Sequence, residues 1–190
     1  MFLITLSHLL KSDFVLFLPT SSSFREVTKM FSGIRPMETS DWPAVLQIYK
    51  EGLATGCATF QTECPSYAQW DVGHSKSCRF VSIIENQVVA WTALSPVSSR
   101  YAYQGVAEVS LYVGEKYRGR NLGTLLLEHL DEEATKAGYW TLQSVIFQDN
   151  KASVRIHEKC GFRLVGYRER IAQDSQGNWR NTVLMEKRSK

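Results

Sequence analysis

The sequence predicts one mixed α/β domain, in which a central, mostly antiparallel sheet is flanked by helices. Three observations predict this fold class. The length of 190 residues, 44% of them hydrophobic, is typical of a single globular domain with a sizeable core. β-rich runs and amphipathic helical stripes alternate along the chain, and hairpins occur at both ends of this pattern. Interleaved helices combined with hairpins favour a mixed sheet over a purely parallel one.

The first elements of the domain are a strand and a helix. Ile34–Met37 is a short β-rich run, and Ser40–Pro43 places a capping side chain just before a proline suited to a first helical turn. Apolar residues then recur at helical spacing up to Gly52 or Gly56, where we expect the helix to end. This stripe consists of Trp42, Val45, Leu46, Tyr49 and Leu53.

The rest of the chain alternates strands with helices. Asn86-Gln87 and the turn at 174–178 each join two β-rich runs into a hairpin, and Gly138 and Gly161 end the two helices. The predicted elements are strands 80–85 and 88–94, a polar loop 95–104, strand 106–113, helix 122–137, strand 140–147, helix 152–160, and strands 162–171 and 182–187.

The first 33 residues are expected to be an N-terminal extension to a folded domain at 34–190. Residues 1–19 are apolar, but they lack the basic leading region and the small-residue cleavage site that are typical of a signal peptide. A targeting segment, or a leader upstream of a true start at Met30, is the alternative interpretation of this extension.

Composition narrows the class of function. There are 22 basic and 19 acidic residues, and the formal charge of +3 is too small to predict binding to nucleic acid or to a membrane surface. No run approaches the roughly 20 apolar residues of a membrane-spanning helix. The four cysteines show neither a CxxC pair nor a zinc-like spacing with histidine, so no metal site is predicted, and a reducing cytoplasm is the simplest location.

A glycine-containing turn between a strand and a helix is the most informative motif. At such a turn, unpaired N–H groups and the positive end of the helix dipole favour a phosphate, and Arg118 and Arg120 add positive charge. The turn is not a Walker loop, and it lacks the full GxGxxG spacing of a dinucleotide fold. We therefore expect it to bind the pyrophosphate of another ligand, with an ordinary basic helix start as the alternative. The binding residues would be Arg118, Gly119, Arg120, Asn121, Leu122, Gly123 and Thr124.

The segment Arg118–Gly123 resembles the Arg/Gln-x-x-Gly-x-Gly/Ala acetyl-CoA motif of GNAT-type N-acetyltransferases, with Asn121 in place of the middle glycine. Asparagine tolerates a left-handed backbone better than most residues, so we expect the turn to be retained. Other motifs resemble the phosphinothricin and methionine sulfoximine acetyltransferase branch of that family. They are Ile34–Met37, Ile48-Tyr49, Ala54–Phe60, Ala93–Arg100, Val106–Val113, Ala152–His157 and Trp179-Arg180. The resemblance implies a GNAT-like acyl-CoA N-acyltransferase fold for residues 34–190, with acetyl-CoA as co-substrate and no metal.

Glu108 is the candidate general base. It lies in an otherwise apolar strand, where a carboxylate is costly unless it is paired or protonated, so we expect its pKa to be raised. A structural ion pair or an outward-facing edge residue is the alternative. The resemblance favours catalysis, because glutamate at this position in the related enzymes deprotonates the substrate ammonium directly or through water.

Asn150, Ser153 and His157 form a second candidate group. Ser153 and His157 are four residues apart and share one helical face, which we expect to face a cleft. The resemblance implies that Asn150 and Ser153 hold the pantetheine and pyrophosphate portions of the cofactor, and that His157 protonates the departing thiolate. The alternatives are a helix cap for Asn150 and a capping or solvent-facing side chain for His157.

The resemblance also implies the remaining parts of the site. The strand containing Leu111, Tyr112 and Val113 is splayed in GNAT-type enzymes, where it pairs with pantetheine and a backbone N–H stabilises the oxyanion. Direct attack on the thioester is expected, without an acetyl-cysteine. The substrate-binding residues would be Phe60, Arg79, Ser98, Ser99, Arg100, Tyr101 and Glu108.

The expected acceptor is a small amino-acid-like amine of the phosphinothricin or methionine sulfoximine type. Its carboxylate would bind Arg79 or Arg100, because a guanidinium can hold both oxygens, although either arginine has a solvated surface charge as its alternative role. By analogy with the related proteins, a homodimer is expected, with the hairpin at Trp179-Arg180 near the partner's site. A polyamine or protein-amine acetyltransferase, or a CoA-binding regulatory module without turnover, remains as an alternative function.

Overall fold

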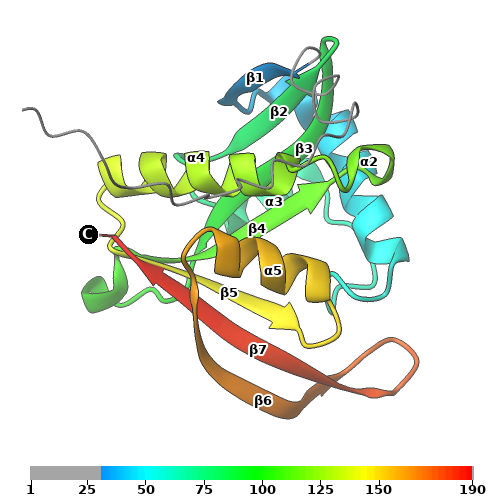
Figure 1. The fold of residues 1–190 in the computed structure, drawn as a ribbon, viewed down its shortest axis with the longest axis vertical. Coiled ribbons are helices and arrows are strands. Elements are labelled where there is room, and N and C mark those ends of the chain that lie inside the picture. The colour runs from blue at the N-terminus through cyan, green and yellow to red at the C-terminus, as the bar shows by residue number, and fades with distance from the viewer. Residues whose placement is uncertain (1–30, 190) are drawn as a thin grey trace, which may run out of the picture.

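The computed structural model describes residues 31–189 (Figure 1), and the expectations for residues 1–30 lie outside the described part of the chain. The helices and strands are β1 (Phe31–Pro36), α2 (Trp42–Ala54), α3 (Tyr67–Gly73), β2 (Phe80–Ile84), β3 (Gln87–Pro96), β4 (Val106–Val113), α4 (Leu122–Lys136), β5 (Thr141–Phe147), α5 (Lys151–Lys159), β6 (Arg163–Gln173) and β7 (Trp179–Arg188). Short 3-10 turns lie at Thr39–Asp41, Tyr101–Tyr103 and Glu115–Tyr117. The first strand thus begins at Phe31, ahead of the predicted domain start at Ile34.

The described strands form one seven-stranded sheet in the order β1-β2-β3-β4-β5-β7-β6. Every neighbouring pair is antiparallel except β4 and β5, which run parallel. The last strand of the chain, β7, lies between β5 and β6, so the long terminal hairpin extends the sheet on the β5 side (Figure 1). The mixed, mostly antiparallel sheet that the sequence predicts is confirmed.

The parallel pair β4 and β5 opens after a few residues. These two strands pair only at Val106, Ala107 and Glu108 of β4, whereas β4 pairs with β3 up to Val113 on its other side. Figure 1 shows the two strands pointing apart beyond this point. Residues 109–113 therefore have no strand partner on the β5 side, and their N–H and C=O groups on that edge can pair with an extended ligand.

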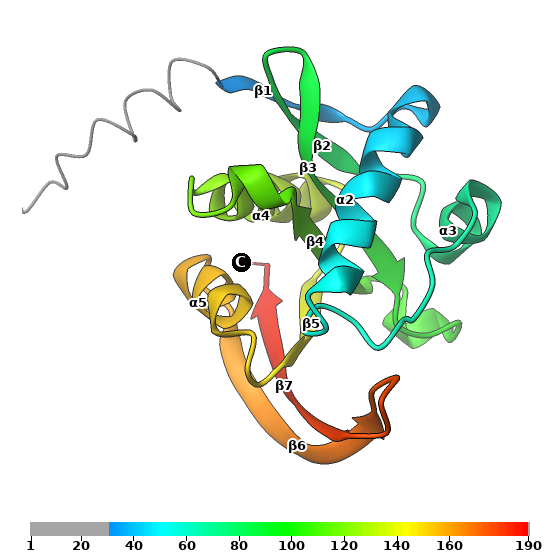
Figure 2. The same cartoon turned by 90° about the vertical axis from the view of Figure 1, so that its right-hand side faces the viewer.

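Helices cover both faces of the sheet (Figure 2). On one face, α4 buries a stripe of apolar side chains at helical spacing, and α5 packs beside it. On the other face, α2 and α3 enclose an aromatic core with β3 and β4. Residues of β4 alternate between these two layers: Ala107 and Leu111 face α4, whereas Tyr112 faces α2.

Helix α3 is absent from the predicted elements. It begins with a capping box, in which the Ser66 hydroxyl accepts a hydrogen bond from the Gln69 N–H and the Gln69 side chain accepts one from the Ser66 N–H. The spacing Ser66-x-x-Gln69 is therefore the sequence signal for this helix. None of the helices in residues 31–189 is both long enough and apolar enough to cross a membrane.

Candidate active site

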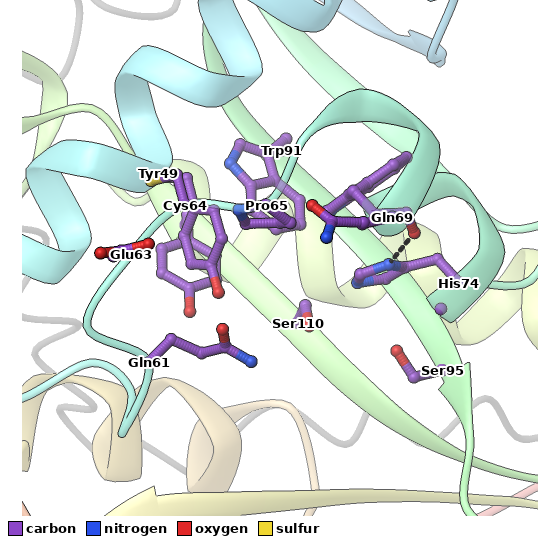
Figure 3. A pocket seen from close by; sticks show the side chains of 13 residues that line it. Tyr49, Gln61, Glu63, Cys64, Pro65, Gln69, His74, Trp91, Ser95 and Ser110 are labelled. Carbon is purple, nitrogen blue, oxygen red and sulfur yellow. Dashed lines mark hydrogen bonds between the residues drawn. The ribbon is translucent and has the colours of Figure 1, made fainter.

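A cavity of about 550 Å³ lies between α2, α3 and the sheet face formed by β3 and β4 (Figure 3). Its walls combine side chains from the two strands, both helices and the segment that joins those helices. The lining residues are Tyr49, Gln61, Glu63, Cys64, Pro65, Gln69, Trp70, Gly73, His74, Trp91, Ser95, Ser110 and Tyr112. Of these, only Tyr112 is among the site residues that the sequence predicts. The other lining residues come from segments far apart in the sequence, which no local motif connects.

Three aromatic side chains form the wall of the cavity nearest α2. The rings of Trp91 and Tyr112 are stacked, with centroids 4.7 Å apart and planes at 15°. Tyr49 packs edge-on against Tyr112 at 5.0 Å. Burial raises the pKa of both tyrosine hydroxyls, so both remain neutral at physiological pH. The wall is consequently tightly packed, uncharged and suited to an apolar group.

Glu108 lies at the edge of this cavity. Because side chains alternate along a strand, Glu108 is on the same face of β4 as Ser110 and Tyr112, and its register partner on β3 is the lining residue Ser95. The Gln143 amide donates a hydrogen bond of 3.2 Å to Glu108 Oε2. These two residues form the last pair before β4 and β5 separate. The half-buried carboxylate is thus placed between the cavity and the open edge of β4.

The predicted phosphate-binding turn connects β4 to α4. Gly119 and Asn121 have φ angles of +74° and +64°, so the left-handed backbone expected at Asn121 is confirmed. The side chains of Arg118 and Arg120 are exposed, and Arg118 Nε donates to the Val113 carbonyl at 3.2 Å. The first three residues of α4 are buried: Leu122, Gly123 and Thr124. The turn therefore presents two guanidinium groups and the free N–H groups of a helix start at one end of the open β4 edge.

Gly123 allows α5 to approach α4 closely. A Cβ at this position would lie 3.0 Å from Ile156 Cδ1 and 3.6 Å from Val113 Cγ2. The glycine of the motif thus has a packing role beside the open edge, in addition to any role in ligand binding.

Asn150 caps α5 and ties it to the segment that follows α2. Its Oδ1 accepts a hydrogen bond from the Ser153 N–H, and its Nδ2 donates to the Cys57 carbonyl, both at 3.1 Å. Ser153 is half-buried in the first turns of α5. This geometry confirms the alternative interpretation of Asn150 as a helix cap.

The expectation that His157 faces a cleft is wrong. Its side chain is 3% exposed, and both ring nitrogens are paired inside the protein: Nε2 with the Ser144 hydroxyl and Nδ1 with the Ser153 carbonyl, each at 2.8 Å. Burial lowers its pKa, so the ring is neutral at physiological pH. The face that holds His157 turns toward β5 rather than solvent, and the ring links α5 to the sheet.

Arg79 also differs from the expectation, because its guanidinium is already occupied. It donates to the Asp71 carboxylate at 2.6 Å and to the backbone carbonyls of Asp71, His74 and Ser75. It also lies over the Trp70 ring at 4.8 Å. With its donors used to close the end of α3, Arg79 is a structural residue outside the cavity lining and has no free guanidinium donors for a carboxylate.

The other predicted substrate residues lie around the site without lining the cavity. Ser99, Arg100 and Tyr101 are exposed in the loop before β4, and the Ser98 hydroxyl accepts a hydrogen bond from the Arg100 N–H. Phe60 packs edge-on against Phe147 at the end of β5, with ring centroids 4.5 Å apart. Arg100 is thus the predicted carboxylate-binding arginine whose side chain remains accessible in the described structure.

Comparison with known proteins places this fold and turn in one family. Residues 42–162 match the acetyltransferase (GNAT) family. A Bacillus subtilis protein provisionally named phosphinothricin acetyltransferase is 34% identical, over 74% of this chain and 89% of that protein. The L-methionine sulfoximine/L-methionine sulfone acetyltransferase of Pseudomonas paraeruginosa is 24% identical, over 83% of this chain and 94% of that protein.

A solved structure agrees with these relatives. The phosphinothricin acetyltransferase of Sinorhizobium meliloti, crystallised in complex with acetyl-CoA, superimposes with a TM-score of 0.75 at 25% identity. The match covers 84% of this chain and 88% of that one. The splayed sheet, the glycine turn and these matches agree, and the chain belongs to the acetyltransferase (GNAT) family.

Proposed function

We propose that this enzyme binds acetyl-CoA along the open edge of β4 and transfers the acetyl group to an amine held in the adjacent cavity. The observation that carries the proposal is the separation of β4 and β5 after Glu108, which connects the Arg118–Thr124 turn to the cavity edge. The pyrophosphate would lie on the turn, with Asn150 and Ser153 of α5 nearby. Pantetheine would pair with the backbone of Leu111, Tyr112 and Val113.

Glu108 is the proposed general base. An ammonium must lose a proton before its nitrogen can attack a thioester, and the Glu108 carboxylate would take that proton directly or through one water. The amine nitrogen then forms a bond to the acetyl carbonyl carbon, and the C–S bond breaks as coenzyme A leaves as a thiolate. The nitrogen loses its remaining extra proton, and the thiolate takes up a proton from water, so that amide and free thiol are the products. A backbone N–H on the open edge of β4 would stabilise the oxyanion of the transition state.

Direct transfer is favoured over a thiol intermediate. Among the cysteines, Cys64 lines the cavity, but burial raises its pKa and so lowers the fraction of reactive thiolate. We assign no catalytic role to this thiol, nor to the buried imidazole of His157.

The proposed acceptor is a small amino-acid-like amine, of the phosphinothricin or methionine sulfoximine type that the relatives' names give. Its ammonium would lie near Glu108, and its carboxylate would bind Arg100 in the loop at the cavity edge. Phe60 and the polar residues Ser98, Ser99 and Tyr101 would complete the binding surface.

A polyamine is the alternative acceptor that one observation favours. The cavity lining contains the carboxylate of Glu63 and neither lysine nor arginine, a charge balance that suits a cationic chain. A screen of amino acids, polyamines and peptides with acetyl-CoA, following release of the free thiol, separates these acceptors. A CoA-binding module without turnover would release no thiol with any of them.

We also propose a cytoplasmic homodimer that binds neither nucleic acid nor membranes. Its four cysteines are free thiols, which suits a reducing compartment. The edge strand β6 and the start of β7 expose the large apolar side chains of Leu164, Tyr167, Ile171 and Trp179, a surface suited to a second copy. Light scattering should give twice the chain mass, and Trp179→Glu should shift it toward the monomer.

The Glu108→Gln variant tests the mechanism. It keeps the size of the side chain but removes the base, so turnover should fall about 10²- to 10⁴-fold at neutral pH, while acetyl-CoA still stabilises the protein against heat. The deficit should shrink at high pH, where more of the acceptor amine is already neutral. Glu132→Gln, an identical change at an exposed position of α4, is the control and should keep full activity. Unchanged turnover of Glu108→Gln across pH would remove this residue from the mechanism.

A further inference from the structure

His74 is a cavity residue that the proposed reaction leaves without a role. It directly follows α3, and its ring stacks on Trp70 with centroids 4.4 Å apart and planes at 22°. Nδ1 lies 2.7 Å from the Trp70 carbonyl oxygen. The ring is therefore held in one orientation by two contacts with the same residue.

The hydrogen bond to Trp70 determines which nitrogen of His74 carries the proton. A carbonyl oxygen can only accept, so Nδ1 must be the donor. Burial, aided by the nearby Arg79 guanidinium, lowers the pKa of His74, whereas hydrogen bonding to Trp70 and the charge of Asp71 act in the opposite direction. The ring is neutral at physiological pH, and Nε2 then carries a lone pair.

Nε2 points into the cavity. Figure 3 shows the second ring nitrogen of His74 directed toward the space above Ser110, on the side of the ring opposite the bond to Trp70. Within residues 31–189, Nε2 has no hydrogen-bond partner. Nε2 is therefore a fixed hydrogen-bond acceptor for the side chain of a substrate bound in the cavity.

The charges around the cavity disfavour an anionic side chain there. The lining includes no lysine or arginine, and the nearby Arg79 has its guanidinium engaged by Asp71 and three carbonyls. A negatively charged group would lose its hydration without gaining a cation. The Trp91–Tyr112 wall, in contrast, suits a methyl or methylene group.

We propose that His74 is a specificity-determining residue, whose Nε2 accepts a hydrogen bond from an N–H or O–H group on a neutral side chain of the acceptor. This inference rests on the proposed function, with the ammonium at Glu108 and the side chain directed toward α3. It predicts preference for a sulfoximine, whose S=NH group donates, over the isosteric sulfone, which only accepts, and over the anionic phosphinate of phosphinothricin.

The test compares kcat/KM for L-methionine sulfoximine, L-methionine sulfone and phosphinothricin in the wild type and two variants. His74→Asn places an amide at the position of Nδ1, so it can keep the bond to Trp70 while the acceptor in the cavity is lost. His74→Gln places its amide oxygen near the position of Nε2 and gives up the Trp70 bond. We expect the wild type to prefer the sulfoximine over the sulfone about tenfold, the Asn variant to lose this preference, and the Gln variant to retain part of it.

Each alternative result overturns a defined part of the inference. Equal kcat/KM for sulfoximine and sulfone in the wild type refutes the role of Nε2 while leaving the proposed function intact. Retention of the preference in the Asn variant with its loss in the Gln variant would show that His74 only closes α3. If the wild type acetylates polyamines or peptides but none of the three amino acids, the proposed acceptor class fails and the inference falls with it.

Discussion

Gly52→Ala should destabilise the protein, even though alanine is the better helix former. Gly52 is buried in α2, and a Cβ there would lie 2.7 Å from both Cδ1 and Cε1 of Tyr112. The Tyr112 ring has little room to move, because Trp91 stacks on it and Tyr49 packs against its edge. The contact can be relieved only by shifting α2 away from the cavity wall.

The magnitude follows from two opposing effects. Alanine favours a helix over glycine by at most about 1 kcal/mol. Overpacking in a close-packed core costs about 1–3 kcal/mol, and the clash with two atoms of a confined ring places Gly52→Ala near the upper end. The net loss of unfolding free energy is about 2 kcal/mol, which for a domain of this size lowers Tm by about 4–8 °C.

Thermal unfolding followed by circular dichroism measures this effect, with Gly73→Ala as the control. Gly73 is the last residue of α3, and a Cβ there would meet nothing within 4 Å, so its Tm should be unchanged or slightly higher. The Gly52→Ala variant should also show a raised KM for the acceptor, because Tyr112 lines the cavity. A Gly52→Ala protein that melts at or above the wild-type temperature would refute the view that the aromatic wall is rigid.

Three further predictions concern residues around the site. Burial lowers the pKa of His157 in the folded protein below its ordinary value of 6.5, so the unfolded chain binds the proton more tightly. The free energy of unfolding should therefore be greatest above about pH 6.5 and should fall as the pH drops toward the folded-state pKa. Denaturant titrations at pH 7.5 and 5.5 measure this decrease, which His157→Gln should diminish. Asn121→Ala should cost about 1 kcal/mol because alanine resists the left-handed backbone, whereas Asn121→Gly should melt close to the wild type; equal melting of the two would contradict the left-handed geometry. Arg180 is paired with two aspartates and donates to the Gly56 carbonyl, so Arg180→Met should lower the free energy of unfolding by about 1 kcal/mol, measured by denaturant titration with Arg180→Lys as a partial rescue.

The elements that were predicted well depend on local patterns. Strand β4 occupies the predicted residues 106–113, and α4 begins at the predicted Leu122 because the glycine turn and the helical stripe are both local features. The left-handed Asn121 was also predictable, since that backbone preference is a property of the residue itself. By contrast, α3 was missed because it is short and its sequence signal is a single capping box.

The roles of individual polar side chains depended on partners that the sequence does not place. In the sequence, Arg79 is a candidate for binding a substrate carboxylate. In the structure, its guanidinium already donates to Asp71 and to three backbone carbonyls at the end of α3. His157 was expected to face a cleft, but its helical face is buried against Ser144 of β5. Both cases follow from the same cause: a polar side chain forms the bonds its folded neighbours offer, and these neighbours are set by packing.

The alternation of strands and helices, the glycine-containing turn after β4 and the position of Glu108 on its strand can be predicted from the sequence, because each depends on residues close together in the chain. The separation of β4 and β5 after Glu108, and the aromatic cavity beside this opening, become visible only in the folded protein. The cavity brings together α2, α3, β3 and β4, and the His74 ring is held beside it by stacking on Trp70 and by the hydrogen bond to the Trp70 carbonyl. Such contacts between distant segments form when the apolar faces of the elements are buried together, and no local pattern encodes them.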